Sequence, residues 1–120
     1  MSDLDARIDA AQIRLARLLR QRIADALRAV PAFERAVSVT VAVMDHPSLV
    51  RVTGPRGTSL WNYDKPGTPE LTALMDDPWS VERDVALLMA LPAARRRLPR
   101  TKRDRDYVIR LSKRDAANGG

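Results

Sequence analysis

The chain has 120 residues and no cysteine, which excludes disulfide-stapled scaffolds, cysteine zinc sites and thiol chemistry. Hydrophobic residues make up 45% of it, enough for one globular domain with a mostly aliphatic core, because aromatic residues are few. The formal charge of +6 is uneven: residues 95–120 hold ten basic and three acidic residues, whereas residues 1–94 are almost neutral. Such a basic segment is suited to a negatively charged partner.

A long amphipathic helix is predicted first, because apolar residues recur at helical spacing over residues 4–30. Ser2 and Asp5 form a capping box at its start, and Pro31 ends it. At 1.5 Å per residue such a helix would be about 42 Å long, which is long for so small a domain. Arg22 falls inside the apolar stripe, where it must reach the stripe's edge, pair with an acid or face a partner subunit. We favour the pairing or the interface.

Three strands are predicted next. Valines alternate with smaller or polar residues over residues 37–44, which is typical of a strand, and shorter strands are expected at 49–53 and 58–63. Turn-forming residues separate them at 45–48 and 54–57. Connections this short favour an antiparallel meander.

Two helices and a last strand are predicted in the remainder. Thr-Pro at 68–69 and Asp-Pro at 77–78 have the composition of an N-cap followed by a first helical residue. They open a short helix ending near residue 75 and a longer one ending near residue 91. Residues 93–98 add one further turn, and a strand is expected at 107–111, where apolar residues alternate.

The predicted fold is therefore a single α+β domain over residues 1–112. It combines a long N-terminal helix, a three-stranded antiparallel meander, two helices and a C-terminal strand in a two-layer sandwich. Residues 99–105 are expected to be a basic linker, and residues 113–120 a flexible basic tail.

No catalytic, metal or cofactor site is expected. His46 lies beside Asp45 and Ser48 in a proline-containing turn, where three sequence neighbours are poorly placed to form a triad. The glycines at 54–57 fit a hairpin turn better than a phosphate cradle, since proline removes one donor and a strand follows. The acids at 76–84 begin a helix, where the helix dipole alone favours them.

The strongest candidate for binding is the basic segment, through contact with nucleic acid or with an acidic protein surface. Tyr107 is the only aromatic residue near it, so stacking on single strands is poorly supported. The candidate residues of this segment are Arg95, Arg96, Arg97, Arg100, Lys102, Arg103 and Arg105.

A protein interface is the second candidate. The first helix is long enough to overhang one small sheet, and the N-terminal end is the one expected to project because Pro31 ties the other end to the first strand. Trp61 is equally compatible with an interface anchor and with packing beneath a helix. The interface candidates are Leu4, Ile8, Leu15, Arg22 and Trp61, with Ala11 in the same stripe.

These observations favour a non-enzymatic adaptor, assembly or inhibitor-type protein that acts through protein–protein contact, such as a virion or mobile-element component. Another protein or a second copy is the expected partner. The first alternative is a nucleic-acid-binding protein that uses residues 95–114. The second is a small metal-independent ribonuclease toxin, for which Tyr107 and Arg110 are the residues to test.

The expected location is the cytoplasm, or the virion for a phage component. The acidic start of the chain does not resemble a signal peptide, and the longest uncharged run, residues 36–44, is too short to cross a bilayer. No membrane partner is therefore expected.

Overall fold

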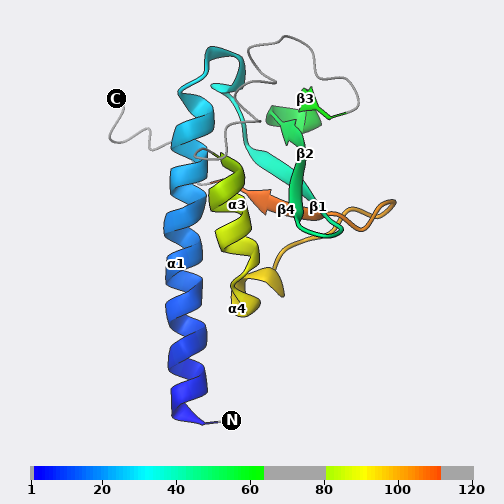
Figure 1. The fold of residues 1–120 in the computed structure, drawn as a ribbon. Helices are drawn as coiled ribbons and strands as arrows, with labels where there is room; N and C mark the ends of the chain where they lie inside the picture. Colours follow the sequence, from blue (N-terminus) through cyan, green and yellow to red (C-terminus); the bar gives the residue numbers. More distant parts are fainter. Residues whose placement is uncertain (1, 64–80, 112–120) are drawn as a thin grey trace.

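The computed structural model describes residues 2–63 and 81–111, and these residues form an α+β fold (Figure 1). The elements in chain order are α1 (Asp3–Arg28), the 3-10 turn η1 (Pro31–Phe33), β1 (Ser38–Val43), β2 (Pro47–Thr53), the 3-10 turn η2 (Pro55–Gly57), β3 (Ser59–Asn62), α3 (Val81–Met89), α4 (Pro92–Arg95) and β4 (Tyr107–Arg110).

Helix α1 begins and ends where local chemistry dictates. The Ser2 side-chain oxygen accepts a hydrogen bond from the Asp5 backbone N–H at 3.1 Å, which satisfies a donor that the first turn would leave unpaired. The helix ends at Arg28, shortly before Pro31, whose ring cannot continue it. Its buried residues face the rest of the domain and are Ala16, Leu19, Ile23, Ala24 and Leu27.

The four strands form one antiparallel sheet in the order β3-β2-β1-β4. The C-terminal strand therefore joins the meander at the free edge of β1, where Ser38 lies opposite Arg110 and Val41 lies opposite Tyr107. Val39 and Ile109 are a cross-strand pair on the buried face of the sheet. Apolar alternation in β1 thus produces one face that packs on the helices and an opposite face that does not.

The helices gather on one side of the sheet, with α3 alongside α1 and against β2 (Figure 1). Val81, Val85 and Leu88 of α3 are fully buried between them. The short helix α4 is tied to α1 by the side-chain oxygen of Gln12, which accepts a hydrogen bond from the backbone N–H of Ala93 at 2.9 Å. The first turns of α1 project beyond this body, so the two-layer description holds only roughly (Figure 1).

The α+β class and the strand near residue 107 are confirmed, but the expected basic linker is wrong. Residues 99–108 instead form a closed hairpin loop, in which the Val108 N–H donates to the Pro99 carbonyl at 2.8 Å. Arg105 has φ 60°, the left-handed conformation that turns the chain back. The predicted helix at 68–75, the start of the next one at 77–80 and the tail at 113–120 lie outside the described residues.

Candidate interaction surfaces

A stripe of large apolar side chains runs along α1 and is exposed to solvent. The exposed fractions are 65% for Leu4, 54% for Ile8, 46% for Leu15 and 63% for Leu18, and Ala11 between them is exposed too. We call these five residues the α1 stripe. Their spacings of four, three, four and three residues place them on one line along a helix. At 3.6 residues per turn, this line lies roughly 100° around the helix from the buried stripe, so the core does not use it.

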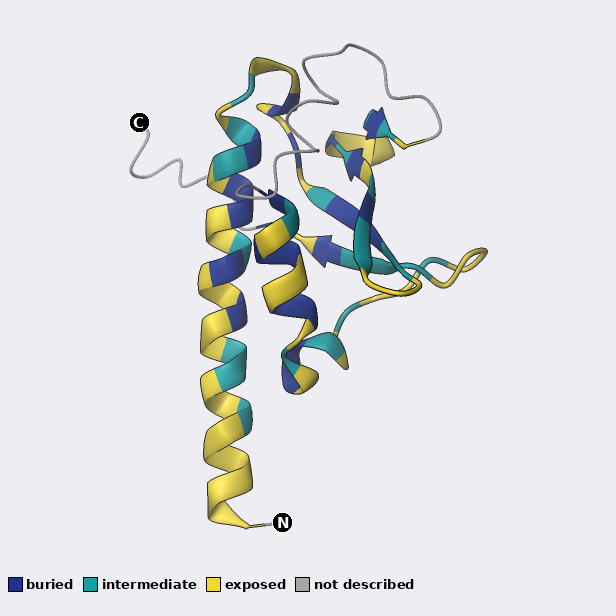
Figure 2. Cartoon of the chain, in the orientation of Figure 1, coloured by how far each residue is buried: buried dark blue, intermediate teal, exposed yellow. Residues whose placement is uncertain are grey.

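The N-terminal overhang expected from the sequence is present. Every residue from 2 to 8 is exposed, as the unbroken yellow of the first turns in Figure 2 shows. The body first reaches α1 where Arg96 approaches Asp9 at 3.4 Å and Ala93 bonds to Gln12. The overhang alone does not account for the α1 stripe, however, because Leu15 and Leu18 lie beside the part of α1 that packs on the domain.

Leu18 was missed as an interface candidate by the sequence analysis. The helical periodicity groups it with Leu19, and the two cannot be separated until the core is known. In the structure Leu19 is buried and Leu18 is exposed. The signal that could have found Leu18 is its position three residues after Leu15, which continues the alternation of four and three.

Arg22 follows Leu18 by four residues and continues the line of the α1 stripe, but as a charge. Its Nε and Nη2 atoms donate to Oδ2 and Oδ1 of Asp84 at 2.8 and 2.7 Å. The hydrogen bonds to Asp84, and then its negative charge, raise the pKa of the Arg22 guanidinium. Of the three outcomes open at the sequence level, the structure shows pairing with an acid. The carboxylate of Asp84, with 9% of its side chain exposed, is committed to this pair.

Trp61 lies in the hydrophobic core rather than on the surface. It packs on the buried side of the sheet, opposite Val52 in the β2–β3 pairing. Its indole Nε1 has no hydrogen-bond partner among the residues that the structure describes. Of the two roles that the sequence left open, packing beneath the helices agrees with this position, and an exposed anchor does not.

Two arginines converge on Tyr107 at the base of the hairpin loop. The guanidinium carbons of Arg95 and Arg100 lie 5.0 and 4.4 Å from the centre of its ring, within cation–π range. The Arg95 Nε also donates to the Tyr107 hydroxyl oxygen at 3.2 Å. This hydrogen bond, aided by the positive charges of Arg95, Arg100 and Arg105 and opposed by burial, lowers the pKa of the Tyr107 hydroxyl. Together with Arg96 and Leu98, these side chains line a hollow of about 570 Å³.

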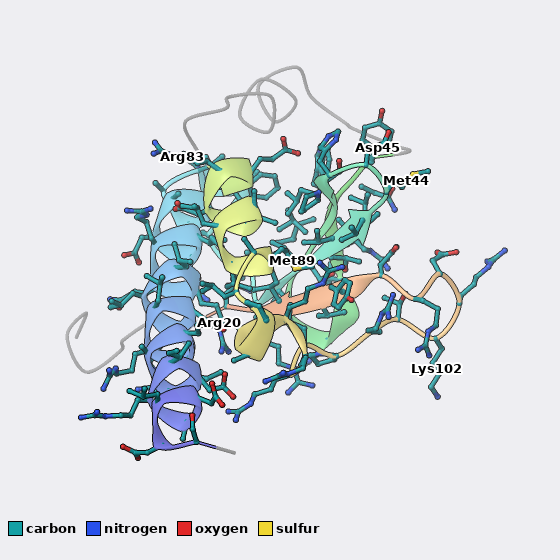
Figure 3. All side chains as sticks on the ribbon, turned by 60° about the horizontal axis from the view of Figure 1, so that its bottom comes forward. Arg20, Met44, Asp45, Arg83, Met89 and Lys102 are labelled. Atoms are coloured by element: carbon teal, nitrogen blue, oxygen red, sulfur yellow. The ribbon has the colours of Figure 1, made fainter. Side chains whose placement is uncertain are left out.

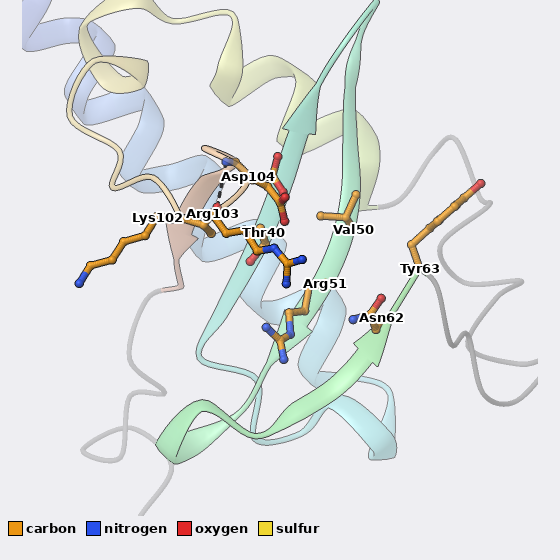
Figure 4. A pocket seen from close by; sticks show the side chains of 10 residues that line it. Thr40, Val50, Arg51, Asn62, Tyr63, Lys102, Arg103 and Asp104 are labelled. Carbon is orange, nitrogen blue, oxygen red and sulfur yellow. Dashed lines mark hydrogen bonds between the residues drawn. The ribbon is translucent and has the colours of Figure 1, made fainter.

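The tip of the same loop contributes to a second hollow, on the face of the sheet opposite the helices. This cavity, of about 530 Å³, lies between the loop and strands β1 to β3 (Figure 4). Arg51 and Arg103 bring positive charge to it, whereas Lys102 points away from the strands. Figure 3 shows that the loop carrying Lys102 projects away from the helices. The basic segment is therefore divided between two hollows and the exposed tip of a loop.

The remaining sequence candidates are not brought into a catalytic arrangement. His46 lies with Asp45 and Ser48 beside a shallow cavity of about 350 Å³, as neighbours along the chain. Tyr107 and Arg110 are three residues apart in β4, so their side chains point to opposite faces of the sheet. Within residues 2–63 and 81–111, no group of three His, Asp or Glu side chains is placed to hold a metal ion.

The chain matches no protein-family model, no curated protein and no solved structure in the three comparisons made. In the described part of the chain, no helix has both the length and the apolar content that crossing a membrane requires.

Proposed function

We propose that this protein is a non-catalytic adaptor or assembly protein that binds another protein along the α1 stripe. The observation that carries the proposal is the alignment of Leu4, Ile8, Leu15 and Leu18 on one exposed line of a long helix. Single exposed apolar residues are common on protein surfaces and need no explanation, but a continuous row of them marks an interaction site. A virion or mobile-element component and a protein-binding inhibitor are settings in which such a docking helix is used.

The surroundings of the α1 stripe support a helical or grooved partner. Apolar anchors at i, i+4, i+7 and i+11 are the pattern by which a helix is recognised through one face. Arg7 and Arg14 flank the stripe and are exposed, which provides the polar rim typical of specific interfaces. The ion pair between Arg22 and Asp84 holds the C-terminal half of α1 against α3, so the stripe is presented on a rigid element.

The experiment is capture of the partner from the source cell with wild-type protein and with Ile8→Glu and Leu18→Glu. We expect both variants to lose the captured protein, because each places a carboxylate in the apolar seam. Gln21→Glu is the matched control: it adds the same charge to the same helix, outside the stripe, and should retain the partner. Retention of the partner by the two stripe variants would contradict the proposal.

Nucleic-acid binding is the second candidate function. It is supported by Arg95, Arg96 and Arg100 lining one hollow while Arg51 and Arg103 line another, since phosphate contacts need several cations directed to one surface. The affinity for a random duplex should then fall steeply and linearly with salt on logarithmic axes.

Charge removal tests this second candidate. The double variant Arg100→Gln/Arg103→Gln should weaken binding and flatten the salt dependence by about two contacts. Arg14→Gln/Arg17→Gln, which removes the same charge from the exposed face of α1, should have little effect. Equal effects of the two double variants would mean that net charge alone, and not the loop, attracts nucleic acid.

A further inference from the structure

We infer that the partner of the α1 stripe is a second copy of this chain, and that the two α1 helices pair antiparallel. This inference rests on the proposed function, because it assumes that the stripe is a docking surface. It goes further by naming the occupant, the direction of the two helices and the register between them.

The spacing of the α1 stripe is the first argument. Steps of four, three, four and three residues are those of the a and d positions of a heptad repeat, with Leu4, Ala11 and Leu18 at d and Ile8 and Leu15 at a. This pattern keeps a seam straight only when the opposing element is another helix with the same repeat. A second copy supplies that repeat by construction, and a two-fold dimer brings the same patch of both subunits together.

Charge along α1 sets the direction. Residues 3–9 hold three aspartates and one arginine, whereas residues 10–22 hold four arginines and no acid. In a parallel pair, acidic turns would face acidic turns and basic turns would face basic turns. In an antiparallel pair, the acidic first turns of one helix lie beside the basic stretch of the other, and the helix dipoles oppose as well.

The register follows from burying every large residue of the α1 stripe. Pairing Ile8 with Leu18 of the partner subunit places Ala11 opposite Leu15 of the partner subunit, so that a d position meets an a position in each layer. Leu4 then lies opposite Arg22 of the partner subunit. The charge of Arg22 ends the apolar seam there, and its own Asp84 already neutralises it.

The absence of cysteine allows the geometry to be read directly, because any disulfide must come from an introduced residue. Ile8→Cys and Leu18→Cys should form a mixed disulfide when combined under mild oxidation. Neither should form one alone, because each position lies about 15 Å along the axis from its own copy in this register. The combination of Leu4→Cys with Leu15→Cys is the register control and should stay unlinked.

The oligomeric state tests the inference without cross-linking. Sedimentation at micromolar concentration should show a dimer, and Leu18→Glu should raise the dissociation constant by roughly tenfold or more, whereas Gln21→Glu should not. Leu4→Glu provides a variant in a region where nothing is buried, so its loss of dimer would not reflect unfolding.

A chain that remains monomeric would overturn the inference, and a self-disulfide of Ile8→Cys would overturn the antiparallel arrangement. A monomer that still captures a different protein through the stripe would leave the proposed function standing and remove only the second copy. A monomer that captures nothing would remove both.

Discussion

Arg22 and Asp84, 62 residues apart in the chain, join α1 to α3 through two parallel hydrogen bonds of 2.8 and 2.7 Å. The two side chains have unequal environments, because the arginine is mostly exposed and the aspartate is buried. The arginine therefore keeps part of its hydration while its fork satisfies a carboxylate that burial would otherwise penalise. This pair fixes the angle at which α1 carries the stripe past the domain.

Arg22→Leu should lower the free energy of unfolding by roughly 1–3 kcal/mol, because it leaves the buried Asp84 carboxylate without its donor. Arg22→Lys should fall between this variant and the wild type, since an ammonium keeps the charge and loses the planar fork. Urea denaturation measures both. The double variant Arg22→Leu/Asp84→Leu should recover part of the loss, and a single Arg22→Leu as stable as the wild type would show that the pair contributes nothing.

Leu18→Ala and Leu19→Ala form a matched pair, because neighbouring residues of the same type have opposite environments. Leu19 is buried, so its truncation should cost about 2–5 kcal/mol in stability. Leu18 is exposed, so its truncation should change the stability of the monomer by at most about 0.5 kcal/mol. Denaturation at submicromolar concentration, where a dimer would dissociate, separates this effect from association. A large loss for Leu18→Ala there would place Leu18 in the core.

Tyr107 should titrate below the ordinary tyrosine pKa of about 10. In a Tyr63→Phe background it is the only tyrosine, so phenolate absorbance reports it alone. Arg95→Gln should move the titration upward, because it removes the hydrogen bond and a positive charge; Arg17→Gln, remote on α1, should not.

The same pKa has a consequence for stability. Since the folded-state pKa lies below the unfolded value, the phenolate favours the folded protein. Its contribution is complete only above the unfolded pKa of about 10, and it disappears as the pH falls through the folded-state pKa. The free energy of unfolding of Arg95→Gln should therefore approach that of Arg95→Gln/Tyr107→Phe at high pH.

Gly57→Ala should lower stability by about 1 kcal/mol through backbone strain alone. Gly57 has φ +75°, a conformation that a side chain disfavours, and no atom lies within 4 Å of the added methyl group. Thermal unfolding with Thr58→Ala as a neighbouring control measures the effect. An unchanged midpoint for Gly57→Ala would mean that the turn between β2 and β3 relaxes at no cost.

Local features of the sequence determined the elements themselves. The cap at Ser2, the stop at Pro31 and the alternation of valines in β1 act on the backbone within a few residues, so each can be read without knowing the rest of the fold. The basic excess near the C-terminus is likewise a property of composition.

Only the tertiary structure decided which apolar side chains were covered. Helical periodicity predicts one broad apolar arc on α1, but the positions of α3 and α4 decide that Leu19 is buried and Leu18 remains exposed. The closed loop at 99–108 and the partner of Arg22 depend on the same packing, because they join segments that no local pattern connects. Burial depends on what the rest of the chain places against a side chain, and for the α1 stripe the described part of the chain places nothing there.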